Sequence, residues 1–376
     1  MRVYLDNAAT TPISPEIIEM MNEMMKTHFA NPSSIHSFGR ESKIIIENAR
    51  KSIADLLNTS PGTIFFTSGG TEADNMAINC GIGSHDIKHA VTSKISHHGV
   101  LYPLQDLEKK GDIKLSYVDI DNHGIVCLSS LEKILKNNPR SFVSIMHANN
   151  EIGTIQDIKK IGYLCKKYNA IFHSDTVQTM AHYPIDISNL NIDFLAASAH
   201  KFHGPKGVGF IFISENINIK PFIRGGGQER NMRAGTENII SIAALAKAME
   251  IAYANLDEES KFIKNLKQYM IDKLKTEIKD VQFFGNCTDL EKSLYTVLSC
   301  SFPKNDKSEM LLFNLDILGV ACSGGSACSS GSNKGSHVLR EIDSSNQRTG
   351  IRFSFSKYNT KEDIDFTIQK LKELFC

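Results

Sequence analysis

Two cysteines, Cys322 and Cys328, lie in a run of glycine and serine that reads GVACSGGSACSSGS (319–332). A free cysteine usually behaves as a small buried side chain, whereas these neighbours predict a flexible, solvated loop. We therefore expect a cysteine here to be bridged, bound to a metal or chemically reactive. The eight cysteines of the chain include no CxxC pair, which argues against a structural zinc site.

A lysine with two histidine neighbours is a second candidate for chemistry. Lys201 lies in SAHKFHGPKG (198–207), where the apolar run DFLAAS (193–198) ends. Most lysines are surface residues in turns. A lysine directly after a buried strand, however, can sit in an apolar pocket, where desolvation lowers its pKa and the neutral amine becomes a nucleophile or a base.

A glycine pair precedes a predicted helix in FTSGGTEADN (66–75). Glycine allows close approach of the backbone, and a helix N-terminus offers free N–H groups and the positive end of a dipole. Thr71 is therefore an N-cap alone, or a cap that also binds phosphate. The stretch lacks the lysine of a P-loop, so the γ-phosphate of a nucleotide is not favoured.

An aspartate, Asp175, ends the apolar run in HSDTVQ (173–178). Ligands of open parallel sheets bind at the carboxyl ends of strands, and a half-buried carboxylate there needs a cationic partner. Alternatively, Asp175 only caps a helix. Together, a phosphate cradle, an aspartate at a strand end and a later lysine indicate pyridoxal phosphate: the lysine would form a Schiff base and the aspartate would keep the pyridine nitrogen protonated.

Short apolar runs alternate with helix-like segments over most of the chain. The predicted strands are residues 63–67, 88–92, 114–118, 141–146, 170–174, 194–197 and 207–212, and segments such as 71–79 and 131–137 predict helices between them. This alternation predicts a mostly parallel sheet covered by helices on both faces. We expect it to form a large α/β domain over residues 14–255.

The pattern changes after a long helical stretch that begins near Thr236. Short strands are predicted around residues 294–302 and 350–356, and helices around 308–318 and 361–374. We expect a smaller α+β domain built from residues 256–376, with residues 1–13 folding back on it. This domain would carry the cysteine loop, residues 319–335.

The composition excludes several classes of partner. The chain has 376 residues, 41% of them hydrophobic, and its formal net charge is zero. No general attraction to nucleic acid or to anionic membranes is expected. The N-terminus lacks the apolar core of a signal peptide, and no apolar run approaches the ~20 residues that span a bilayer. We therefore expect a cytoplasmic protein whose cysteines are thiols.

Taken together, these motifs resemble a known family. The chain resembles the cysteine desulfurases of the NifS/IscS kind, in the class V group of fold-type I pyridoxal-phosphate enzymes. The matching stretches follow in order over nearly the whole chain: 4–12, 31–40, 67–78, 96–101, 146–158, 173–179, 198–209, 225–239, 322–332, 336–340 and 351–356.

The resemblance implies a role for each matching residue. Lys201 would hold pyridoxal 5'-phosphate and move the Cα proton of the substrate. Asp175 would pair with the pyridine nitrogen, Gln178 would lie near the phenolic oxygen, and His97 would stack on the ring. The phosphate would be bound by Gly70, Thr71, Ser198 and His200, and by Thr236 of the neighbouring subunit in a homodimer. Asn150, at the cofactor, and Arg352 would bind the substrate; a guanidinium suits a carboxylate because it donates two parallel hydrogen bonds.

The resemblance also implies what the cysteine loop does. L-cysteine would become L-alanine while an enzyme thiolate takes its sulfur as a persulfide, for which the family pattern indicates Cys328. A glycine- and serine-rich loop allows the thiol to reach the cofactor and then to swing outwards. Cys322 would be a bystander or a disulfide partner of Cys328. No catalytic metal is expected.

Several alternatives stay open at this point. The sulfur acceptor could be an iron–sulfur scaffold, a carrier for tRNA thiolation or a DNA phosphorothioation partner. A class V transaminase would not need Cys328, whereas selenocysteine lysis would use the same residues. An interaction protein on a decayed enzyme fold would not need Lys201, Asp175 and His97. The segment NKG (333–335) departs from the Glu-Pro ending usual in the family, so the mobility of the loop could differ.

Overall fold

The computed structural model describes residues 1–304, 310–324, 335–343, 345 and 348–375. The helices are α1 (Pro15–Thr27), α2 (Ser37–Leu56), α3 (Gly70–Ser84), α4 (His98–Lys109), α5 (Leu128–Asn137), α6 (Ile158–Lys167), α7 (Ile239–Ala254), α8 (Leu256–Glu277), α9 (Leu311–Ile317), α10 (His337–Ile342) and α11 (Lys361–Phe375). The strands are β1 (Val3–Tyr4), β2 (Ile64–Thr67), β3 (His89–Thr92), β4 (Lys114–Tyr117), β5 (Phe142–Ser144), β6 (Ile171–Asp175), β7 (Phe194–Ser198), β8 (Gly209–Ile213), β9 (Gln282–Phe283), β10 (Val297–Pro303), β11 (Val320–Ala321) and β12 (Arg348–Ser354).

The largest sheet of the described chain has seven strands in the order β2-β8-β7-β6-β5-β3-β4. Strands β7, β6, β5, β3 and β4 are parallel neighbours, whereas β8 runs antiparallel to both β7 and β2. Each predicted run contains most of one of these strands. The predicted α/β fold with a mostly parallel sheet is confirmed.

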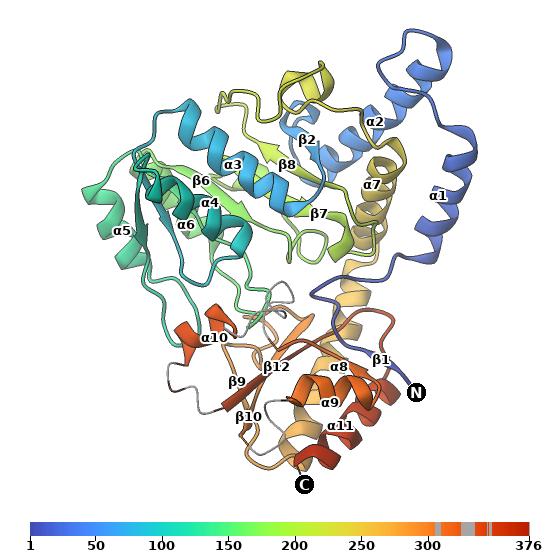
Figure 1. Cartoon of the computed structure of the whole chain (residues 1–376), viewed down its shortest axis with the longest axis vertical. Coiled ribbons are helices and arrows are strands. Elements are labelled where there is room, and N and C mark those ends of the chain that lie inside the picture. Colours follow the sequence, from blue (N-terminus) through green and yellow to red (C-terminus); the bar gives the residue numbers. More distant parts are fainter. Residues whose placement is uncertain (305–309, 325–334, 344, 346–347, 376) are drawn as a thin grey trace.

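Helices cover both faces of this sheet (Figure 1). Successive strand residues point to opposite faces, so they join different cores. Phe66 and Leu195 belong to a core that includes residues of α1, α2, α5, α6 and α7. Phe65 and Phe194 belong to a second core with residues of α3 and α4. Burial on both faces explains why the strands are continuous apolar runs and not alternating ones.

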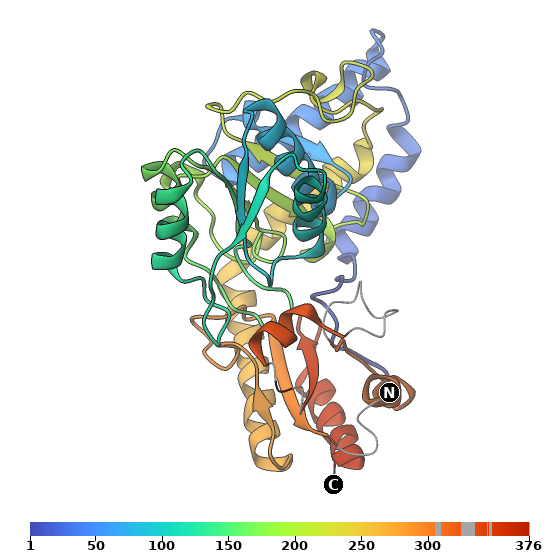
Figure 2. The ribbon, with the colours of Figure 1, turned by 60° about the vertical axis from the view of Figure 1, so that its left-hand side comes forward.

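A separate region is built from the C-terminal part of the chain (Figures 1 and 2). An antiparallel sheet, β12-β10-β9, packs with α8 and α11 around its own apolar core. The N-terminal strand β1 pairs in parallel with β11, Val3 opposite Val320. Both chain termini therefore lie in this region (Figure 1).

The long helical stretch is two helices, not one. Helix α7 ends at Ala254, α8 begins at Leu256, and their axes meet at 74°. Helix α7 packs against the large sheet, and α8 runs down into the C-terminal region (Figure 2). Among the described helices, none taken singly has the length and apolarity to cross a membrane; the bent pair α7–α8 meets that test only when taken together.

Candidate active site

A cavity of about 180 Å³ lies where the carboxyl ends of the parallel strands meet the N-terminus of α3. Its walls come from the large sheet, from the N-terminal segment and from β12. The residues that line it are Ala8, Ala9, Gly70, Thr71, Asp74, His97, Met146, Asn150, Asp175, Val177, Gln178, Ser198, His200, Lys201 and Arg352. Every predicted site residue within the described chain lines this cavity, with the exception of Thr236.

The N-terminus of α3 forms one wall of the cavity. Helix α3 begins at Gly70 and has Gly69 as its N-cap, with φ at 152° and no side-chain capping hydrogen bond. A Cβ atom at Gly70 would lie 2.5 Å from Cγ2 of Val177, so only glycine fits. The backbone N–H groups of the first turn and the Ser198 hydroxyl at the end of β7 thus form a surface suited to an anion.

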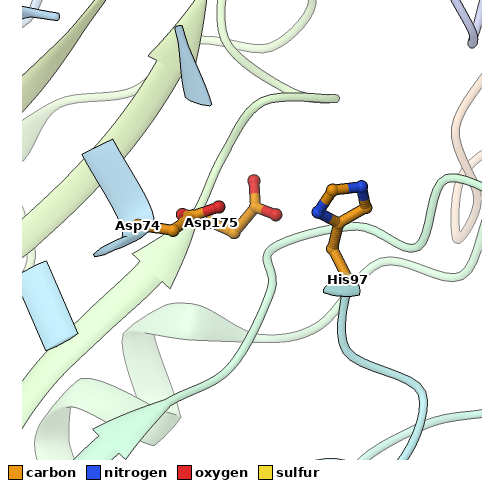
Figure 3. A group of neighbouring side chains, drawn as sticks. All are labelled: Asp74, His97 and Asp175. Carbon is orange, nitrogen blue, oxygen red and sulfur yellow. The ribbon is translucent and has the colours of Figure 1, made fainter. Parts of the chain in front are cut away.

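Two aspartates and a histidine lie together at the base of the cavity (Figure 3). Asp175 ends β6, and its Oδ1 accepts a hydrogen bond from the backbone N–H of Val177 at 2.9 Å. The side chain of Asp175 lies between Asp74, from α3, and His97. Ligand atoms of the three residues lie within 4.8 Å of one another, a spacing that a cation could also use. The expectation of no catalytic metal therefore stays a prediction.

The protonation of these three groups follows from their burial. Burial, and then the charge of Asp175, raise the pKa of Asp74 well above its usual range. This shift favours the neutral form of Asp74 beside the carboxylate of Asp175. His97 is the N-cap of α4, and its Nδ1 accepts a hydrogen bond from the Gly99 N–H at 3.0 Å. Burial lowers the pKa of His97, so the ring is neutral and carries its proton on Nε2.

Lys201 ends a short 3₁₀ turn, Ala199–Lys201, directly after β7. Its Nζ donates hydrogen bonds to the carbonyl oxygens of Ala8 at 2.7 Å and Ala9 at 2.8 Å. The Gln178 amide donates to the same Ala8 oxygen at 3.0 Å. The N-terminal segment therefore lies across the cavity and holds the lysine amine in place.

His200, beside the lysine, stays uncharged. Its Nδ1 lies 3.1 Å from the Thr10 hydroxyl. Burial, and then the positive charges of Lys201 and Lys206, lower the pKa of His200 to about 4. At neutral pH the ring can therefore offer a hydrogen bond to an anion but adds no charge to the cavity.

The opposite wall carries a buried arginine, Arg352 of β12. Its Nη2 pairs with Oδ1 of Asp6 at 2.6 Å, and its Nη1 donates to the carbonyl oxygen of Asn150 at 2.9 Å. The Ser323 hydroxyl donates to the same Asp6 oxygen at 2.8 Å. The Nε atom of Arg352 is buried and has no hydrogen-bond partner among the described residues. Arg352 is therefore a buried cation of the cavity lining that Asp6 and the Asn150 carbonyl hold in place.

Three predicted residues are not among those that line this cavity. Thr236 lines a different cavity of about 120 Å³, together with Glu229 and Arg233. Cys328 lies outside the described residues, as does most of the predicted cysteine loop. Cys322 is described: it packs against the C-terminal core, and burial raises the pKa of its thiol. In the described conformation Cys322 is not poised as a thiolate.

Sequence reasoning missed five residues of the lining: Ala8, Ala9, Asp74, Met146 and Val177. Asp74 carried a usable signal, because it follows Gly70 by four residues on the same helix and so faces the same side. The others offered none, since they contribute backbone carbonyls or apolar surface.

Comparisons with known proteins agree on one family. The profile described as Aminotransferase class-V matches residues 3–366. A relative described as cysteine desulfurase IscS from Dictyoglomus turgidum is 43% identical over 377 residues, covering 99% of this chain and 94% of the relative. A solved structure described as a NifS-like protein superimposes with a TM-score of 0.91 at 37% identity, covering 100% of this chain and 99% of the other.

A third comparison concerns a structure with a bound small molecule. The structure described as SspA in complex with cysteine has a TM-score of 0.82 and 30% identity, over 95% of this chain and 100% of the other. The family model, the relative and these structures cover nearly the whole chain. The chain therefore belongs to the class V aminotransferase family and, within it, to the cysteine desulfurases.

Proposed function

We propose that this enzyme binds pyridoxal 5'-phosphate in the cavity around Lys201 and uses it to convert L-cysteine to L-alanine. The observation that carries the proposal is the meeting of Lys201, Asp175, His97 and the N-terminus of α3 in one cavity of about 180 Å³. Enzymes of this family depend on pyridoxal phosphate in general. A structure of a relative's fold with bound cysteine supports L-cysteine as the substrate.

The residues present fit this cofactor. The uncapped first turn of α3 and Ser198 suit a phosphate. The glycine at position 70 leaves room where a side chain would collide with Val177. The Asp175 carboxylate has no cationic side chain within ion-pair distance among the described residues, so a protonated pyridine nitrogen would supply the missing charge.

Different side chains of the cavity would hold the cofactor, move a proton and orient the substrate. When bound, pyridoxal phosphate supplies an electron sink that makes the Cα proton of the substrate acidic. Lys201 Nζ would hold the cofactor and then accept that proton. His97 Nε2–H is placed to donate a hydrogen bond within the cavity. Arg352, the guanidinium in the lining of the cavity, would orient the carboxylate of the substrate.

Sulfur leaves the substrate by transfer to an enzyme cysteine, for which we propose Cys328. Its thiolate forms a bond to the substrate sulfur as the Cβ–S bond breaks. The electron pair of that bond stays with carbon, which takes up a proton and departs as alanine. The enzyme keeps the sulfur as a persulfide. The burial of Cys322 favours Cys328 over it for this role.

We also propose a homodimer of two-domain subunits, with a large domain of residues 14–255 and a small one of residues 1–13 and 256–376. The separate apolar cores of the two regions support this division. Large apolar side chains exposed along α1, α2 and their connection support a dimer: Met25, Phe29, Ile35, Phe38 and Ile44. Thr236 does not line the cofactor cavity of its own subunit. In the dimer it would bind the cofactor phosphate in the cavity of the neighbouring subunit.

The proposal extends to the cellular location of the enzyme and to the protein that accepts its sulfur. Six cysteines of the described residues are free thiols, which supports a reducing, cytoplasmic setting. The acceptor would be an iron–sulfur scaffold or another sulfur carrier, such as one for tRNA thiolation.

Release of alanine and sulfide from L-cysteine in the presence of a thiol reductant tests the proposal. We expect the wild type and Cys322→Ala to turn over, and Cys328→Ala to lose turnover while it keeps the absorbance of the bound cofactor. If Cys328→Ala turns over and Cys322→Ala does not, the nucleophile is Cys322. If neither change matters, sulfur is not carried by this loop and transamination becomes the better reading.

A further inference from the structure

A histidine and a tyrosine lie behind Lys201, outside the cavity that receives the cofactor. His182 and Tyr295, together with Lys201, line a second cavity of about 20 Å³. Neither His182 nor Tyr295 lines the cavity of about 180 Å³. These two side chains are therefore placed to act on the lysine and not on the substrate.

The two side chains form a hydrogen-bonded chain that ends on the main chain of Lys201. His182 Nε2 lies 3.0 Å from the carbonyl oxygen of Lys201, and His182 Nδ1 lies 2.9 Å from the hydroxyl oxygen of Tyr295. A carbonyl oxygen can only accept, so Nε2 must carry the proton. Nδ1 is then the acceptor, and the Tyr295 hydroxyl must donate to it.

Burial determines which group donates and which accepts in each of these hydrogen bonds. His182 is buried, which lowers its pKa, and the ring therefore stays neutral with one donor and one acceptor nitrogen. Burial raises the pKa of Tyr295 well above its usual range, so its hydroxyl keeps the proton that it donates. Each nitrogen of His182 thus has one partner that matches it, and the other tautomer would lose the hydrogen bond to the Lys201 carbonyl.

The chain also joins two parts of the fold. His182 follows β6 of the large sheet, whereas Tyr295 precedes β10 and packs in the C-terminal core. The Tyr295 backbone N–H donates to the Tyr183 hydroxyl at 3.2 Å, which holds the tyrosine in position. Lys201 is therefore fixed at both ends: at Nζ by Ala8 and Ala9, and at its carbonyl by His182.

We propose that His182 and Tyr295 are positioning residues that set the main chain of Lys201 and tie it to the C-terminal region. This inference rests on the proposed role of Lys201. A lysine that bonds to the cofactor and then moves a proton must keep its amine within a small volume, and misplacement by ~1 Å can cost about a hundredfold in rate. The pair supplies this constraint without contacting the reacting atoms.

Four variants of the full chain test the proposal. Tyr295→Phe removes the donor and keeps the ring. His182→Gln keeps one donor and one acceptor, whereas His182→Ala removes both. Tyr253→Phe is the matched control, because Tyr253 is a half-buried tyrosine whose hydroxyl donates to the carbonyl oxygen of Tyr183 at 3.3 Å and not to His182. Melting temperatures show whether each variant is folded.

Two readouts are measured on each variant. The first is the rate at which Lys201 of the cofactor-stripped chain is captured by pyridoxal 5'-phosphate and borohydride. The second is kcat and KM for L-cysteine. Because one lost hydrogen bond is worth ~1 kcal/mol, we expect Tyr295→Phe to lower the capture rate and kcat about fivefold, with KM unchanged. The capture rate and kcat of His182→Ala should fall at least as far. Those of His182→Gln and Tyr253→Phe should stay near the wild-type values.

The outcomes separate this inference from the proposed function. Equal capture rates for folded Tyr295→Phe and Tyr253→Phe would overturn the positioning role, as would equal rates for His182→Gln and His182→Ala. A wild type that captures the cofactor at Lys201 but releases no alanine would overturn the proposed function. In that case a slower capture by Tyr295→Phe would still support the positioning role.

Discussion

The two walls of the cavity are built in different ways. The sheet side, formed by Gly70, Asp175 and Ser198, consists of residues at the ends of strands and at the start of the following helix. The arginine side consists of Asp6, Asn150 and Arg352, which meet from distant parts of the chain. The sheet side combines the backbone N–H groups at the start of α3 with the carboxylate of Asp175, whereas on the arginine side the Arg352 guanidinium is paired with Asp6.

The two sides should therefore respond differently to substitution. At the start of α3 the backbone leaves little room for an added side chain, so a change at Gly70 should fail for steric reasons, whereas a change at Asp175 should fail for electrostatic ones. A wall of paired charges depends on which partner holds the cation, so its failures are electrostatic. The predictions below separate the two, in order of expected effect.

The largest effect should come from the carboxylate at the end of β6. Asp175→Asn removes the charge that would hold the pyridine nitrogen protonated, and loss of one such preorganised partner typically costs ~10²–10³ in rate. We expect kcat/KM for L-cysteine to fall accordingly, measured as alanine release.

Asp74→Asn is the matched control for that variant. Burial and the charge of Asp175 raise the pKa of Asp74, which favours its neutral form, and asparagine resembles that form closely. A loss of activity in Asp74→Asn as large as that in Asp175→Asn would show that Asp74 works as an anion.

A side chain added at the start of α3 should cause a steric clash. Gly70→Ala would place its Cβ 2.5 Å from Cγ2 of Val177, and overpacking of this kind costs ~1–3 kcal/mol. We expect lower stability in urea and weaker cofactor binding. Gly83→Ala, on the same helix with no atom within 4 Å, should instead stabilise by ~0.5–1 kcal/mol. Equal effects of the two changes would contradict a steric role for Gly70.

Acid should destabilise the sheet side through His147, whose backbone N–H donates to the carbonyl oxygen of Asp175 at 2.8 Å. Burial lowers the pKa of His147 to about 4. The unfolded chain, with an ordinary histidine, binds the proton near pH 6.5, so stability is lost as pH falls from about 6.5 to 4. The loss from this residue should reach about 2 kcal/mol at pH 5.

Urea unfolding at pH 7 and at pH 5 measures this loss. His147→Gln has no ring to protonate, so its stability should fall less between the two pH values than that of the wild type. An identical fall in both proteins would exclude His147 as a source of acid sensitivity.

The smallest effect should appear on the arginine side. Arg352→Lys keeps the charge but removes the planar pair of donors, so KM for L-cysteine should rise about tenfold while cofactor binding is unchanged. Arg348→Lys on the same strand is the control, because Arg348 donates to Ser301 and lies outside the cavity. If cofactor binding were lost in Arg352→Lys, the division between the two walls would be wrong.

The sequence allowed prediction of the sheet side better than of the arginine side. Apolar runs bounded by turn residues located β2 to β8, and motifs around Gly70, Asp175 and Lys201 lie where those strands end. The family resemblance supplied Arg352, but its pairing with Asp6 could not be foreseen, because the two residues are 346 positions apart. Likewise, the bend at Asn255 and the raised pKa of Asp74 depend on tertiary packing.

One measurement tests the central claim most directly: a single turnover of the cofactor-loaded enzyme with L-cysteine and no reductant. The released alanine is quantified, and mass spectrometry of the digested chain locates any added sulfur. We expect one alanine for each sulfur gained, with the sulfur on the peptide that contains Cys328. Alanine without added sulfur, or sulfur on another cysteine, would contradict it.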